Sequence, residues 1–135
     1  RVTQITEVRK NWEDDPEREN GFVDLMRYNV EKDELEPTDA LINGDSETIK
    51  SIAGNVKDWA GNWDAVWDNI MLRARIKERL VEYASVKDKQ WMLEASFVVK
   101  SNDMMHETLN KVRGEKGWLD NKEVYKRWNT WLQAF

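Results

Sequence analysis

The spacing of apolar residues changes near residue 44, and this change predicts two regions of different secondary structure. Before it, apolar and polar residues alternate in Val2–Val8 and in Phe22–Tyr28, and β-branched residues dominate the first of these segments. Alternation with a period of two is typical of half-buried β-strands. The charged, Pro-containing segment 11–20 predicts an exposed loop, and residues 35–37 predict a short third strand that completes a hairpin.

From residue 45 onward, apolar residues recur every three or four positions, which is typical of amphipathic helices. Asp45 or Ser46 is the expected N-cap of a first helix, and Asn62 the expected cap of a long helix over 63–84. The first helix has an apolar face of Ile49, Ile52, Ala53 and Val56. The predicted buried stripe of the long helix is Trp63, Val66, Trp67, Ile70, Ala74, Leu80, Val81 and Ala84.

Three further helices follow in the same pattern. A third helix is expected over 89–99, and a fourth begins at Ser101 or Asp103 and continues through Val112. Asp120 or Asn121 is the expected cap of a last helix, which carries Val124, Trp128 and Trp131 on one face. The sequence therefore predicts an α+β fold that is mostly α, with short antiparallel strands over 1–44 followed by a Trp-rich bundle of four or five helices over 45–135.

Composition narrows the classes of function. With 135 residues the chain has the length of one domain, and it contains no cysteine, which excludes disulfides and thiolate metal sites. Between Asn11 and Thr48 there are 13 acidic and 3 basic residues, whereas from Ile49 to Phe135 there are 12 acidic and 15 basic. Because phosphate contacts need Lys and Arg, this balance argues against nucleic-acid binding.

Candidate catalytic and metal sites are weak. The segment "GDSETIK" is the nearest approach to a phosphate-binding loop, but it lacks the glycine cradle. His106 is the only histidine and is interpreted as a helix-surface residue. Asp64 and Asp68 are spaced for one helix face, where a carboxylate pair could bind a divalent ion, but stabilisation of the helix N-terminus is the favoured interpretation. We expect no catalytic, cofactor or metal residue.

Candidate contact residues lie in the helical region. Among the eight tryptophans, Trp63, Trp67, Trp128 and Trp131 are expected first as core residues and, if the chain does not cover their rings, as anchors for a partner. Arg73 and Lys77 share one helix stripe that could meet an acidic partner, phosphates or an anionic membrane, although a solvated charged face is the simpler interpretation.

The opening segment "RVTQITEV" resembles a strand motif of the type II/type IV secretion ATPases, a family that includes archaeal flagellum and pilus motors. Arg1, Val2, Thr3, Ile5, Glu7 and Val8 match the form Arg-Arg-Val-Thr-x-Ile-x-Glu-Val. The hairpin that follows resembles archaeal members, with Tyr28, Asn29, Asp33 and Leu35 at its turn. This similarity covers about the first 40 residues.

The resemblance implies a parent protein that binds ATP and Mg²⁺, works as a hexamer and drives secretion or pilus assembly on the cytoplasmic side of the membrane. The nucleotide-binding motifs of the family would lie upstream of Arg1, so no catalytic residue is carried over. The chain is then expected to be a non-catalytic C-terminal region. Its expected partners are the rest of the ATPase chain, neighbouring subunits and a membrane platform protein.

Two alternatives stay open. The chain could be an autonomous α+β interaction module without an ATPase parent, or a small enzyme built around Asp64 and Asp68. If the strands normally join a larger sheet, the separate chain should expose unpaired strand edges and self-associate through them.

Overall fold

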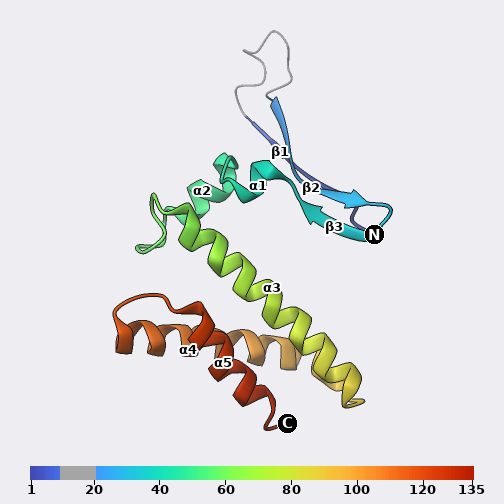
Figure 1. Ribbon diagram of the computed structural model, residues 1–135, viewed down its shortest axis with the longest axis vertical. Helices are drawn as coiled ribbons and strands as arrows, with labels where there is room; N and C mark the ends of the chain where they lie inside the picture. Colours follow the sequence, from blue (N-terminus) through green and yellow to red (C-terminus); the bar gives the residue numbers. More distant parts are fainter. Residues whose placement is uncertain (10–20) are drawn as a thin grey trace. The chain divides into compact units, whose positions relative to one another are not determined.

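The computed structural model describes residues 1–9 and 21–135, which divide into two compact units, 1–67 and 68–135. The helix α3 (Trp63–Val86) begins in the first unit and continues into the second. Strands come first and helices dominate the rest of the chain (Figure 1), so the predicted α+β, mostly α, fold is confirmed. The predicted loop at 11–20, including Trp12, lies outside the described residues.

The first unit is built on a three-stranded antiparallel sheet in the order β1-β2-β3. Its strands are β1 (Gln4–Val8), β2 (Phe22–Asn29) and β3 (Glu34–Pro37). Val8 pairs with Phe22 and Tyr28 pairs with Leu35, and the β1–β2 register shifts between Ile5 and Thr6. Both strand segments and the hairpin predicted from alternation are confirmed.

Two short helices follow the sheet. The first, α1 (Asp39–Ile42), is capped by the Thr38 side chain and was not predicted. The second, α2 (Glu47–Ala53), has Ser46 as its N-cap, which resolves the choice between Asp45 and Ser46. The expected apolar face of this helix is wrong in part, because Ile52 and Val56 are exposed and Ala53 is the residue that is buried. The core of the unit is made by Leu25, Leu41, Ala53 and Val66.

The second unit packs the rest of α3 with η3 (Gln90–Leu93), α4 (Ala95–Lys116) and α5 (Asn121–Leu132). The prediction of two separate helices across 89–112 is wrong, because α4 runs without a break through residues 99–103. Ser101 is buried in mid-helix, where its Oγ accepts a hydrogen bond from Trp128 Nε1 at 3.2 Å, so it caps nothing. Asp120, not Asn121, caps α5.

The buried face of α3 also differs from the predicted stripe. Ala74 and Val81 are exposed, whereas Leu72, Ile76 and Tyr83 are buried. Leu72, Ile76 and Tyr83 join the core that α3 shares with α4 and α5. The core of the second unit is one cluster: Leu72, Ile76, Leu80, Tyr83, Ala84, Met92, Phe97, Met105, Leu109, Val112, Val124, Trp128 and Leu132.

Candidate functional site

A groove in the second unit is the best candidate for a binding surface, and it is lined by residues of α3 and α4. Its floor contains Ile76, Leu80 and Met105, all of which belong to the hydrophobic core. Val98 and Val99 also line it, and the side chain of Val99 is 59% exposed. The groove holds a volume of about 300 Å³, which is at the lower end of the range for ligand pockets in proteins.

Two of the residues predicted as partner contacts line this groove. Arg73 and Lys77 lie one helical turn apart on α3, so their charges are neighbours on one side of the groove. Neither forms an ion pair with another residue in the described part of the chain. They are the charged residues among those that line the groove, whose polar members are Ser101 and Asn102. The surface therefore combines an apolar floor with positive charge.

The four tryptophans predicted as contact residues have different surroundings. Trp128 is fully buried in the core of the second unit. Trp131 is half-buried and stacks on Phe97, with ring centroids 5.7 Å apart. Trp63 is half-buried in the first unit, where its Nε1 donates to the carbonyl oxygen of Ile42 at 2.8 Å. Trp67 is half-buried at the end of that unit. None of the four lines the groove.

An aromatic cluster closes the second unit and was missed in the sequence. The ring centroid of Phe135 lies 5.1 Å from those of Phe97 and Trp131. The ring centroid of Trp91 lies 5.2 Å from that of Phe97. The Lys100 ammonium lies 5.0 Å from the centre of the Phe135 ring. Phe97, Ser101, Met105 and Leu109 recur at four-residue intervals, which indicates one buried helix face. This pattern was missed because two separate helices were predicted, with a break near residue 100.

In the first unit, the buried carboxylate of Glu7 is surrounded by hydrogen-bond donors. Its carboxylate accepts hydrogen bonds from the hydroxyl group of Ser46 and from the backbone N–H groups of Glu47 and Thr48, at 3.1 and 3.2 Å. Burial raises the pKa of Glu7, but the hydrogen bonds from Ser46, Thr48, Glu47 and Arg9 together outweigh it and leave this pKa below its ordinary value. The carboxylate therefore serves as a fixed cap on the first turn of α2.

The pKa shifts of other ionisable groups also follow from contacts within the fold. Hydrogen bonds from Thr6, Gln4 and Arg27 lower the pKa of Asp24 to about 2. Hydrogen bonding and the charge of Arg127 lower the pKa of Glu115, while Lys116 and the capped N–H of Glu123 lower the pKa of Asp120. Each of these shifts follows from hydrogen bonds or ion pairs within the fold, and structural networks of this kind perturb pKa values as catalytic sites do.

The structure does not bring the other candidate residues, Asp64, Asp68 and His106, together into a site. Asp64, Asp68 and His106 are each exposed. Across residues 1–9 and 21–135, no group of three or more His, Asp or Glu residues is arranged to hold a metal ion. Asp68 lines another pocket with Arg75 and Trp118, and the Arg75 guanidinium lies 4.2 Å from the ring centre of Tyr125.

Comparisons with models of protein families, with curated proteins and with solved structures found no match for this chain. Within the described residues, none of the helices has the length and apolar character that crossing a membrane requires.

Proposed function

We propose that this chain is a non-catalytic contact region of a secretion-type ATPase, and that the groove formed by α3 and α4 is its contact surface. The observation that carries the contact role is the apolar floor of Ile76, Leu80 and Met105 beside the unpaired charges of Arg73 and Lys77. The floor residues are buried, and the exposed apolar side chains of the groove are Val98 and Val99. Exposed apolar side chains beside fixed charge are typical of sites that bind another protein.

The assignment to an ATPase rests on the resemblance of "RVTQITEV", and the surroundings of Glu7 are compatible with it. Glu7 is part of the resembling motif, and its carboxylate ties strand β1 to the first turn of α2. In this proposal Glu7 serves to hold these two elements together. ATP and Mg²⁺ would then be bound by the parent protein, upstream of Arg1, and not by this region.

In this proposal the partners are the remainder of the ATPase, neighbouring subunits and a membrane platform protein. The working place would be the cytoplasmic face of the membrane. The net positive charge of the second unit, with 13 basic and 10 acidic side chains, favours an acidic protein surface as its counterpart.

The groove supports a second candidate equally, an autonomous interaction module without an ATPase parent. The reading frame ahead of the Arg1 codon separates the two. A phosphate-binding loop encoded in that frame supports the ATPase, and a start codon next to Arg1 supports the module.

The experiment on the protein itself measures nucleotide binding and turnover. We expect calorimetry with ATP and Mg²⁺ to give no heat of binding, and phosphate release to stay at the level of the buffer. Turnover that copurifies with the chain and is lost in Asp64→Ala/Asp68→Ala, with the fold intact, would instead establish the small enzyme.

A further inference from the structure

The two units differ in charge, which suggests what the groove binds. By formal count, residues 1–67 hold 16 acidic and 8 basic side chains, a net charge of −8, whereas residues 68–135 hold 10 acidic and 13 basic, a net charge of +3. Two copies of one chain with this asymmetry attract each other when the first unit of one meets the second unit of the other.

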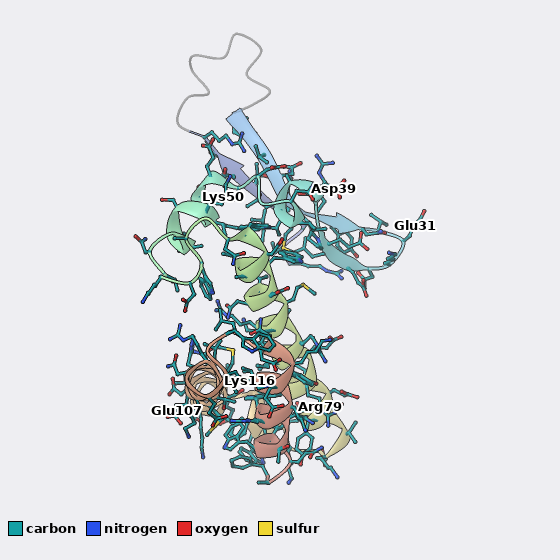
Figure 2. The ribbon with its side chains drawn as sticks, turned by 60° about the vertical axis from the view of Figure 1, so that its left-hand side comes forward. Glu31, Asp39, Lys50, Arg79, Glu107 and Lys116 are labelled. Atoms are coloured by element: carbon teal, nitrogen blue, oxygen red, sulfur yellow. The ribbon has the colours of Figure 1, made fainter. Side chains whose placement is uncertain are left out.

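The turn between β2 and β3 is the part of the first unit that matches the groove. Val30 at this turn is 80% exposed, the largest value among the exposed large apolar side chains of the described residues. Glu31 follows Val30 in the turn, and Glu34 begins β3 opposite Asn29, the residue before Val30. Both are exposed, and neither forms an ion pair within the described chain. Figure 2 labels Glu31 at the outer end of the β2–β3 hairpin. We call Val30, Glu31 and Glu34 the hairpin tip.

Other charges at this turn are already neutralised. Asp33 pairs with Arg1, and Lys32 pairs with Glu36 at 3.1 Å. The carboxylates of Glu31 and Glu34 are therefore the ones left to pair with a partner. The hairpin tip combines one apolar side chain with two free negative charges, and the groove combines an apolar floor with two free positive charges.

We infer that the groove binds the hairpin tip of a second copy of this chain. In this contact Val30 enters the space above Ile76 and Leu80, and Glu31 and Glu34 lie next to Arg73 and Lys77. The volume of about 300 Å³ accommodates a valine side chain. The inference rests on the proposed contact role of the groove and names its occupant.

Such a contact joins two different surfaces, so every copy keeps one free tip and one free groove. Assemblies of this kind grow into open chains or close into rings, and they do not stop at a symmetric dimer. Screening by salt should weaken the association, because the paired charges lie at the edge of the contact.

The test is analytical ultracentrifugation of the complete chain from about 1 μM to about 1 mM, at low and high salt. The wild-type protein should associate beyond a dimer as its concentration rises. Arg73→Glu/Lys77→Glu and Glu31→Lys/Glu34→Lys should each weaken association by about tenfold or more. The control Lys111→Glu/Lys126→Glu changes charge by the same amount on α4 and α5 and should associate like the wild type.

Mixing the two reversed variants gives the decisive result. In each variant alone, the hairpin tip and the groove carry charge of the same sign and repel each other. In the mixture, the tip of each variant is opposite in charge to the groove of the other, so the association of the wild type should return. Circular dichroism confirms that both variants are folded.

Three results would overturn the inference. The wild-type chain could stay monomeric, or the mixture of the two variants could stay monomeric. The third is association that is unchanged in Arg73→Glu/Lys77→Glu, as expected if copies pair through their strand edges. A monomer would leave the groove to an acidic helix of another protein or to no partner. None of these results touches the ATPase assignment, which depends on the upstream reading frame.

Discussion

The carboxylate of Glu7 in β1 accepts a hydrogen bond from the hydroxyl group of Ser46, the N-cap residue of α2. Both side chains are buried, and Ser46 Oγ in turn accepts from the backbone N–H of Ile49 at 3.1 Å. A strand residue and a helix cap that lie 39 positions apart therefore complete each other's hydrogen bonds. This pair fixes where α2 begins relative to the sheet of the first unit (Figure 1).

Glu7→Gln should destabilise the first unit. The groups around this carboxylate are donors, so an amide would place its own N–H₂ against one of them and lose the negative charge at the helix start. We expect the free energy of unfolding to fall by about 1–3 kcal/mol. Urea denaturation gives this number, and hydrogen exchange at the amides of Glu47 and Thr48 should accelerate.

The control for this change is Glu31→Gln, an exposed residue of the same unit. At about 1 μM, the lowest concentration of the association experiment, it should alter the free energy of unfolding by less than about 0.5 kcal/mol. If both variants unfold at the same urea concentration, the cap formed by Glu7 does not contribute to stability.

A second contact in the first unit depends on the absence of a side chain. Gly44 has φ +80°, and a Cβ atom built there would lie 2.5 Å from the Trp63 ring. Gly44→Ala should therefore cost the left-handed strain of about 1–2 kcal/mol and, in addition, displace the tryptophan. The loss of the hydrogen bond from Trp63 Nε1 to Ile42 would appear as a shift of the indole N–H signal in NMR spectra.

Gly61 supplies the matched control for that variant. Its φ is +69°, but a Cβ atom there would have no neighbour within 4 Å. Gly61→Ala should show the backbone strain alone, so the difference between the two variants measures the contact with Trp63. Equal losses of stability would mean that the ring moves aside freely.

In the second unit, the hydrogen bond from Trp128 to Ser101 joins α5 to α4. Trp128 is fully buried, so Trp128→Ala should reduce the free energy of unfolding by about 3–5 kcal/mol. Ser101→Ala leaves the indole N–H without a partner and should cost about 1–3 kcal/mol. Trp118, which is 58% exposed, is the control, and Trp118→Ala should cost less than about 0.5 kcal/mol.

The sequence could predict this region only in part. Val124 and Trp128 lie on one face of α5 as their spacing indicates, and Asp120 caps the helix. The break expected near Ser101 was wrong because serine, although it favours helix N-caps, also occurs inside a helix where its hydroxyl group finds a hydrogen-bond partner. That partner, Trp128, lies 27 positions away, so nothing near Ser101 in the sequence identifies it.

The groove shows the same limit. Arg73 and Lys77 were recognised from their shared stripe, because that relation is local to α3. Val98 and Met105, which complete the groove, lie on a helix whose predicted boundaries were wrong. The predicted buried face of α3 was wrong in part. Val66, Leu80 and Ala84 are buried as expected, but Ala74 and Val81 are exposed. Leu72 and Ile76 are buried in their place, in the core that α3 shares with α4 and α5.

The last prediction concerns pH and Asp24. Hydrogen bonds from Thr6, Gln4 and Arg27 lower its pKa from 3.8 to about 2 in the folded chain. A carboxyl group with a lowered folded-state pKa stabilises the fold above its unfolded-state pKa, and this stabilisation is lost as the pH falls from about 4 towards 2. The first unit should therefore lose stability in that window, and Asp24→Asn should be less stable at neutral pH but lose less on acidification.

Urea denaturation followed by hydrogen exchange of the β1 and β2 amides, repeated at steps from neutral pH to about pH 2, tests this. Thr6→Val removes the first of the three hydrogen bonds and should fall between the wild type and Asp24→Asn. The comparison is made between variants because the lowered pKa values of Glu7 and Glu36 contribute in the same direction in all of them. If the free energy of unfolding falls equally with decreasing pH in the wild type and in Asp24→Asn, the hydrogen bonds to Asp24 do not favour its charged form.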